Sequence, residues 1–248
     1  MRTANPALNQ KAFTGLEYSG YNENTMTIQG TVNKTAMLLA FTAISALYTW
    51  NLFFETNNPA AVMPYTIAGA LGGFIVALVT VFKKTWSPIT APIYAVLEGL
   101  LLGGLSAIFE MQFKGIVVQA VGLTFGTLFC LLMAYKSGLI KATENFKLGV
   151  AAATGGICLL YFITMILGFF GIRMPYIHES GVVGIGFSLF VVVIAALNLV
   201  LDFDFIESGA AAGAPKYMEW YGAFGLVVTL VWLYIEILRL LSKLRSRD

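Results

Sequence analysis

Charged residues are scarce in this chain of 248 residues, since Asp, Glu, Lys and Arg make up 11% of it. A soluble domain carries about 25% charged residues, which argues against a soluble globular fold. Disorder is excluded as well, because disordered chains are poor in aromatic residues, which reach 14% here. Hydrophobic residues make up 58% of the chain, and this predicts an integral membrane protein in contact with the lipid bilayer. The net charge of +2 is too small to indicate nucleic-acid binding.

Cysteine and histidine, which supply many metal sites and nucleophiles, are also rare. The two cysteines, Cys130 and Cys158, are too few for a disulfide framework, and their apolar neighbours in the sequence predict inert buried thiols. The one histidine, His178, falls in a loop, where we expect it to be solvated. The sequence has no HExxH, GxSxG, P-loop or CxxC motif, and no lysine inside the last apolar segment to hold retinal. We therefore expect neither an enzyme nor a resident cofactor, and we exclude a rhodopsin-like pigment.

Seven apolar segments reach the length of about 20 residues that a helix needs to cross the hydrocarbon core. They lack the alternation of membrane-barrel strands, and helices satisfy their own backbone hydrogen bonds in lipid. The predicted spans are residues 35–54, 63–82, 90–109, 116–135, 148–170, 182–201 and 217–241. The sequence thus predicts an all-α membrane domain over residues 34–248. A flexible polar tail over residues 1–33, without the apolar core of a signal peptide, precedes it.

The distribution of Lys and Arg between the spans predicts a cytoplasmic N-terminus in the cell (inner) membrane, because basic residues gather on the cytoplasmic side. With this orientation, Lys114 and Arg173 are the basic residues outside through the first six spans. Nine basic residues lie inside: Arg2, Lys11, Lys34, Lys83, Lys84, Lys136, Lys141, Lys147 and Lys216. The basic C-terminal end leaves two alternatives: the last helix crosses the membrane despite its charges, or it is re-entrant and returns to the cytoplasm.

Glycines recur four residues apart in three successive spans, and such pairs let membrane helices approach closely. The pairs are Gly69 and Gly73, Gly99 and Gly103, and Gly122 and Gly126. Small and polar residues also share one stripe of the last span, at steps of three and four. This stripe consists of Gly222, Gly225, Thr229, Trp232, Glu236, Arg239 and Lys243. We expect it to face protein or a wet cavity, although Glu236 and Arg239 could instead form a simple pair near the membrane interface.

Four acidic residues in or beside the spans are candidates for ion binding or gating: Glu98, Asp202, Asp204 and Glu219. An aspartate at the centre of a membrane helix costs roughly 2.5–3.5 kcal/mol, so it persists mainly where it has a use. Asp202 and Asp204 face about 200° away from each other on a helix, so both reach one cavity only if the helix unwinds. The alternative is that they form a solvated helix end with Glu207.

Three C-terminal segments carry a resemblance to a known family: residues 201–207 (LDFDFIE), 215–221 (PKYMEWY) and 232–239 (WLYIEILR). With the opening residues MRTANPAL, they resemble a prokaryotic branch of the Bax inhibitor-1 (YccA-like) family, over nearly the whole chain. The resemblance implies a seven-helix fold in which the other six helices surround the last one. It also implies a calcium leak sensitive to pH, or a modulatory role in membrane stress and protease control.

The resemblance further assigns roles to single residues. In studied relatives, an aspartate late in the sixth helix and another in the last helix form a proton-sensitive pair, with a basic residue nearby. Asp202 matches the first aspartate, whereas the second position falls on Thr229. The basic partner falls near Lys83 or Lys84. The carboxylates that could replace the missing one are Glu98, Asp204, Glu219 and Glu236.

These observations support two hypotheses from different classes. The first is a cation leak in which Asp202 is both ligand and gate, because Ca²⁺ takes 6–8 oxygen ligands. Its flux is expected to depend on pH, since protonation removes the charge of the carboxylate. The second is a non-transporting regulator that binds another membrane protein, such as a membrane protease, through its helices or its polar tail. Release of calcium from loaded vesicles discriminates between the two.

Overall fold

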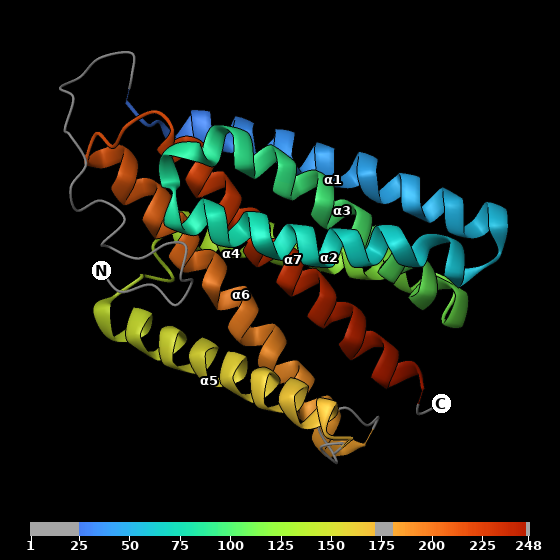
Figure 1. Cartoon of the computed structure of the whole chain (residues 1–248). Coiled ribbons are helices and arrows are strands. Elements are labelled where there is room, and N and C mark those ends of the chain that lie inside the picture. Colours follow the sequence, from blue (N-terminus) through green and yellow to red (C-terminus); the bar gives the residue numbers. More distant parts are fainter. Residues whose placement is uncertain (1–24, 172–180, 247–248) are drawn as a thin grey trace. The chain divides into compact units, whose positions relative to one another are not determined.

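The computed structural model describes residues 25–171 and 181–246. These residues form seven long helices and one 3-10 turn, with no strand beyond an isolated bridge between Thr25 and Pro215. Each of the seven helices is long and apolar enough to cross a membrane, which confirms the predicted all-α fold with seven spans. In chain order (Figure 1) the elements are α1 (Ile28–Thr56), α2 (Pro59–Phe82), η2 (Lys84–Trp86), α3 (Ser87–Gln112), α4 (Ile116–Lys136), α5 (Glu144–Phe169), α6 (Val182–Ala211) and α7 (Met218–Arg245).

The first helix begins earlier than its predicted start at residue 35. Thr27 caps it, because its hydroxyl accepts a hydrogen bond from the backbone N–H of Gly30 at 2.9 Å. Residues 28–33, which the composition assigned to a flexible tail, are therefore helical. The tail residues 1–24, which include Arg2 and Lys11, lie outside the described part of the chain, as do Arg173 and His178.

The sixth helix extends beyond its predicted end at residue 201 and continues to Ala211. The helix does not unwind at Asp202, whose side chain is fully buried, whereas Asp204 is 17% exposed. The interpretation of a solvated helix end is therefore wrong for Asp202. The seventh helix is one unbroken helix over Met218–Arg245, which is the form of a full crossing and not of a re-entrant hairpin.

The described chain divides into two compact units, each held together by its own contacts. The α1–α3 unit contains residues 25–114 and 205–228, so it includes the connection between α6 and α7. The α4–α5 unit contains residues 115–171, 181–204 and 229–246. α7 thus contributes its first half to one unit and its second half to the other. It is also the most buried helix, with 67% of its most apolar stretch buried against 17% in α2, α4 and α5.

Glycine pairs explain how closely the helices of the α1–α3 unit pack side by side (Figure 1). A Cβ atom added at Gly103 of α3 would overlap the backbone oxygen of Ala46 in α1, and one added at Gly69 of α2 would meet the backbone of Leu97 in α3. Two of the three predicted pairs therefore serve close helix contacts. The third does not, because a Cβ at Gly122 or Gly126 of α4 would meet no described atom within 4 Å.

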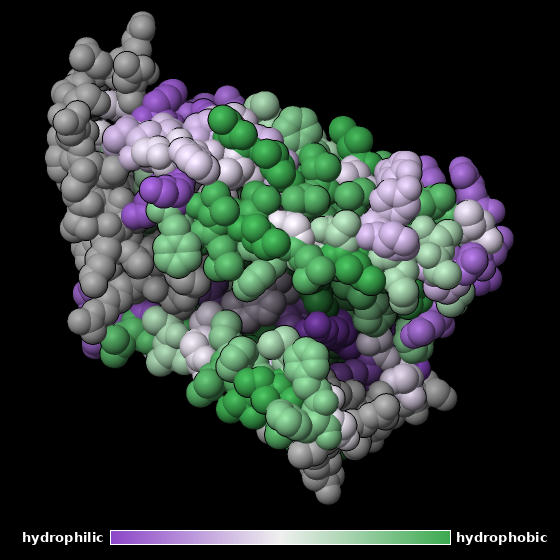
Figure 2. Space-filling model, viewed as in Figure 1, coloured by the Kyte–Doolittle hydropathy of each residue, from purple (hydrophilic) through white to green (hydrophobic). Residues whose placement is uncertain are grey.

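Hydrophobic side chains cover most of the outer surface of the helices, as Figure 2 shows for the face in view. The exposed residues include Leu71 and Phe74 on α2 and Leu159 and Phe162 on α5. In a protein with seven spans, these side chains contact lipid. Cys130 and Cys158 are exposed on the same kind of surface, so the prediction of buried thiols is wrong. Apolar sequence neighbours are found equally on lipid-facing and on buried positions of a membrane helix.

Candidate functional site

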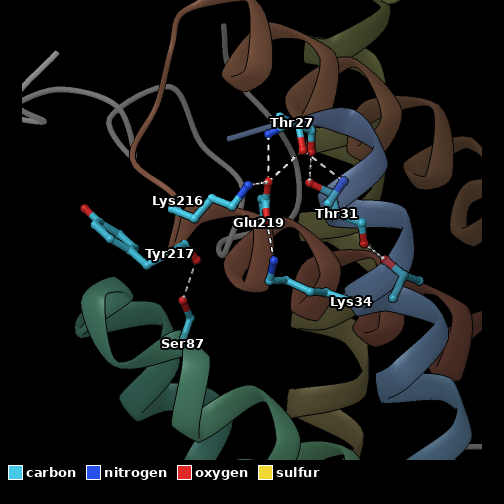
Figure 3. A network of polar contacts seen from close by, with 9 residues as sticks. Thr27, Thr31, Lys34, Ser87, Lys216, Tyr217 and Glu219 are labelled. Atoms are coloured by element: carbon cyan, nitrogen blue, oxygen red, sulfur yellow. Dashed lines mark hydrogen bonds and ion pairs between the residues drawn. The ribbon is translucent and has the colours of Figure 1, made fainter. Parts of the chain in front are cut away.

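A buried carboxylate joins the starts of α1 and α7 in the α1–α3 unit (Figure 3). Glu219 lies in the first turn of α7, and its side chain is fully buried. Its Oε1 accepts hydrogen bonds from the backbone N–H of Thr27 at 2.9 Å and from its hydroxyl at 2.8 Å. Lys216 pairs with the same oxygen at 2.9 Å, and Lys34 of α1 pairs with Oε2. Burial of this charge is tolerated because several donors surround it.

Further contacts surround this network. The Nζ atom of Lys34 lies 5.5 Å from the centroid of the Trp220 ring, in cation–π geometry. The hydroxyl of Ser87, at the start of α3, donates to the backbone oxygen of Tyr217 at 2.9 Å (Figure 3). A Cβ atom at Gly30 would overlap the carboxylate of Glu219. Glu219 therefore ties the start of α7 to the start of α1, and Ser87 ties the start of α3 to the residue that precedes α7.

In the α4–α5 unit, polar residues of α5 recur every seven residues, at Lys147, Thr154 and Tyr161. Residues seven apart on a helix lie on the same face, about 10.5 Å apart along the axis. Each of the three contacts a polar side chain of α6 or α7, as described below, so this α5 stripe faces the interior of the unit. The α5 stripe creates three polar layers in an otherwise apolar helix packing.

The first layer is an ion pair near the start of α5. The Nζ atom of Lys147 lies 2.8 Å from Oδ2 of Asp204 in α6 and 3.5 Å from Glu144. The Lys147 side chain is 3% exposed, so this cation is buried. Asp204 is thereby engaged in joining α5 to α6.

The second layer is formed by neutral groups in the middle of the helices. Asn198 of α6 is 2% exposed and donates from Nδ2 to the hydroxyl of Thr154 at 2.9 Å. The same amide nitrogen donates to the backbone oxygen of Ile194 at 2.8 Å. The amide oxygen of Asn198 has no hydrogen-bond partner among the described residues.

The third layer contains Glu236 and Arg239 of α7, whose pairing was predicted from their spacing in the sequence. Arg239 pairs with Glu236 at 2.8 Å, and the guanidinium carbon lies 5.7 Å from the centroid of the Tyr161 ring. The hydroxyl of Tyr161 is 3.1 and 3.2 Å from the two carboxylate oxygens of Glu236 and donates to them. Glu236 is buried while the Arg239 side chain is 48% exposed. The pair is therefore more than a surface contact, because it also joins α5 to α7.

Asp202 and Thr229, the positions that the resemblance matched to a proton-sensitive pair, both belong to the α4–α5 unit. Asp202 is fully buried and Thr229 is 2% exposed. Asp202 follows Asn198 by one helical turn, so the two side chains share the buried face of α6. Lys83 and Lys84 belong to the α1–α3 unit, where the Nζ atom of Lys84 lies 5.9 Å from the centroid of the Tyr221 ring.

Glu98 is the buried carboxylate of α3. Its side chain faces Gly73 of α2, where an added Cβ atom would lie 3.1 Å from Oε2. The hydroxyl of Tyr94, one turn earlier on α3, donates a hydrogen bond to it. Within residues 25–171 and 181–246, Glu98 forms no ion pair. The residues that the structure describes contain no group of three or more His, Cys, Asp or Glu side chains placed to hold a metal ion.

Several residues of these networks were not among the site residues predicted from the sequence. From the sequence, Lys34 and Lys147 served only as basic residues that predict the cytoplasmic side of the membrane. The seven-residue spacing of Lys147, Thr154 and Tyr161 would have revealed the α5 stripe. Nothing local connects Lys34 with Glu219, which is 185 residues away along the chain.

Comparison with known protein families identifies this chain's family. The family model described as Bax inhibitor 1 like matches residues 5–246, which is nearly the whole chain and includes all seven helices. Neither a curated protein sequence nor a solved structure matches the chain. The extent of the family match agrees with the resemblance carried by the C-terminal motifs and with the seven-span fold. The chain belongs to the Bax inhibitor 1 like family of membrane proteins.

Proposed function

We propose that the protein is a cation leak of the cell membrane that passes calcium at a rate dependent on pH. Asp202 is the residue that binds and gates the ion. A non-transporting regulator that binds another membrane protein, such as a membrane protease, is the alternative. The two differ in whether the protein alone lets an ion cross a bilayer.

The burial of Asp202 is the observation that carries the proposal. Its side chain is fully buried on an unbroken helix whose residues 182–201 contain no charged side chain. A buried carboxylate in a membrane helix is costly, and intramembrane acids commonly mark ion pathways. Three other acids near the spans form ion pairs that support the fold: Glu219 with two lysines, Asp204 with Lys147 and Glu236 with Arg239.

The chemistry of a carboxylate explains both properties of the proposed leak. Carboxylate oxygens are hard ligands of the kind that Ca²⁺ prefers. Protonation removes the negative charge, so the same group that attracts the ion also makes the flux depend on pH. Thr229 carries a neutral hydroxyl at the second position of the family pair. Asp202 is therefore the one carboxylate of this pair that binds the ion and responds to pH.

Calcium release from vesicles that contain the purified protein tests the proposal. Wild type should release calcium with a pH-dependent rate. Asp202→Asn keeps the shape and removes the charge, so it should lower the release about tenfold or more, the effect of a barrier about 1.4 kcal/mol higher, and flatten the pH profile. Glu207→Gln, which alters an exposed acid on the same helix, is the matched control and should behave like wild type.

Introducing the missing carboxylate provides a second test. Thr229→Asp should sharpen the pH response, because the resemblance places the second aspartate of the family's proton-sensitive pair at this position. Vesicles that stay calcium-tight at every pH would refute the leak and leave the regulator as the better hypothesis. A pH profile of Asp202→Asn identical to wild type would remove Asp202 from the mechanism and direct attention to Glu98.

A further inference from the structure

The amide of Asn198 occupies an unusual place in the α4–α5 unit. It lies in the middle polar layer of the α5 stripe, is 2% exposed, and precedes Asp202 by one turn of α6. Residues four apart on a helix have Cβ atoms about 5–6 Å apart, so one small ligand can contact both side chains. No basic residue occurs in residues 148–169 of α5, anywhere in α6, or in residues 218–238 of α7.

The orientation of this amide is determined by its hydrogen bonds. The backbone oxygen of Ile194 can only accept, so the amide atom 2.8 Å from it must be the nitrogen. The nitrogen uses its second proton for the hydroxyl of Thr154 at 2.9 Å. The amide oxygen is therefore directed away from both partners, and it has no hydrogen-bond partner among the described residues.

A buried amide oxygen without a partner loses its hydrogen bonds to water and gains nothing in return. Such groups are rare in folded proteins, and they commonly have a water, an ion or a functional role. Here the second hydrogen bond of the amide is made by Thr154 from a neighbouring helix, which holds the oxygen in one orientation. The arrangement is that of a preoriented neutral oxygen ligand next to a carboxylate.

We propose that the side-chain oxygen of Asn198 is a second ligand for the cation that Asp202 binds, and that Thr154 is its positioning residue. The ligand class is a hard cation such as Ca²⁺, which accepts both amide and carboxylate oxygens. This inference rests on the proposed function, since it extends the Asp202 site by one helical turn. It assigns a role to a neutral side chain that no charge pattern would reveal.

Calcium release and calcium binding are measured on wild type and three variants. Asn198→Leu replaces the amide by an apolar group of the same branched shape and number of heavy atoms, Thr154→Val removes the positioning hydroxyl, and Thr124→Val is the matched control. Thr124 is a buried threonine of α4 that donates to the backbone oxygen of Ala120 in its own helix. Binding is followed in detergent as the rise in thermal unfolding temperature on adding calcium, because a ligand stabilises the state that binds it.

The expected result is that Asn198→Leu lowers calcium release about tenfold or more, the effect of a barrier about 1.4 kcal/mol higher, and abolishes the stabilisation by calcium. Thr154→Val should lower both, and Thr124→Val neither. Thr154→Val also keeps the test decisive if Asn198→Leu does not fold. Equal release and equal calcium stabilisation in wild type, Asn198→Leu and Thr154→Val would overturn the inference, as expected if the amide binds water only, while leaving the leak intact. A wild type that does not leak refutes the proposed function, and the stabilisation by calcium then decides the inference alone.

Discussion

At the scale of the residue, the acidic side chains divide according to what they contact. Glu219, Asp204 and Glu236 each pair with a basic side chain, which is Lys216 at 2.9 Å, Lys147 at 2.8 Å and Arg239 at 2.8 Å, respectively. Such pairs stabilise when both members are present and destabilise strongly when one is removed. Substitutions in these ion pairs are therefore expected to change the stability of the protein, whereas substitutions of Asp202 are expected to change the ion flux.

We predict that Glu219→Gln destabilises the protein. The substitution removes the charge that Lys34 and Lys216 surround, and hydrogen bonds to a charged group are worth about 1.5–3 kcal/mol each. Because the two lysine side chains are 17% and 46% exposed, solvent screens them, and we expect a loss of about 1–3 kcal/mol. Thermal unfolding in detergent measures it, with Glu55→Gln on the exposed face of α1 as the control. An unfolding temperature equal to that of the control would contradict the assigned role of this network.

The Lys147–Asp204 pair permits a double-mutant cycle. Lys147→Met leaves Asp204 without its cation in a mostly buried place, so we expect a loss of about 3 kcal/mol. Asp204→Asn in the same chain should restore part of the stability, because the neutral pair carries no uncompensated charge. Unfolding temperatures of the two single variants and the double variant provide the measurement. Additive losses would show that the two residues are not energetically coupled.

At the scale of the element, the same glycine motif has two different meanings. In α2 and α3, the glycines Gly69, Gly99 and Gly103 allow the backbone of a neighbouring helix to approach. In α4, a Cβ atom at Gly122 or Gly126 would point into open space on the described chain. The motif therefore indicates close packing only where a partner helix faces it.

Alanine substitutions should separate these two meanings. Gly103→Ala forces a Cβ atom against the backbone of Ala46, and overpacking of this kind costs about 1–3 kcal/mol. Gly126→Ala meets no neighbour, so it should stabilise α4 by about 0.5–1 kcal/mol through helix propensity alone. Unfolding temperatures of the two variants should shift in opposite directions. Equal shifts would mean that the packing of α1 on α3 tolerates the added methyl group.

At the scale of the whole molecule, seven crossings place the two ends of the membrane domain on opposite sides of the bilayer. The distribution of basic residues through the first six spans predicts that the N-terminal side is cytoplasmic, with nine basic residues there against two outside. The basic end of α7, with Arg239, Lys243 and Arg245, then lies outside. The charge rule is satisfied by the first six spans and opposed by the last.

A cysteine at position 141 tests this orientation. In a chain whose lipid-facing Cys130 and Cys158 are replaced by alanine, Lys141→Cys should not react with a membrane-impermeant thiol reagent added to intact cells. The reagent should react after the cells are opened, which shows that the thiol is accessible. Labelling of intact cells would place the connection between α4 and α5 outside and reverse the proposed topology.

Much of this protein is determined by local features of its sequence. A run of about 20 apolar residues is sufficient to place a membrane helix. The number and approximate position of the seven spans therefore follow from the hydropathy along the chain. Helix ends were less predictable, because they depend on single contacts. The cap at Thr27 extends α1 toward the N-terminus. The sixth helix continues through Asp202 and Asp204, although the apolar run that predicted it ends at residue 201.

The partners of the polar side chains were decided only by the tertiary structure. Lys34 and Glu219 are 185 residues apart, and Thr154 and Asn198 are 44 residues apart. No local pattern connects them, since the pairing depends on which helix faces come together in space. The sequence determined which residues lie in the membrane and which of them are charged. The tertiary structure decided that the Glu219 charge ties helix starts together, and that the oxygen of Asn198 is held one turn from Asp202, because helix packing alone selects the contacts of a buried group.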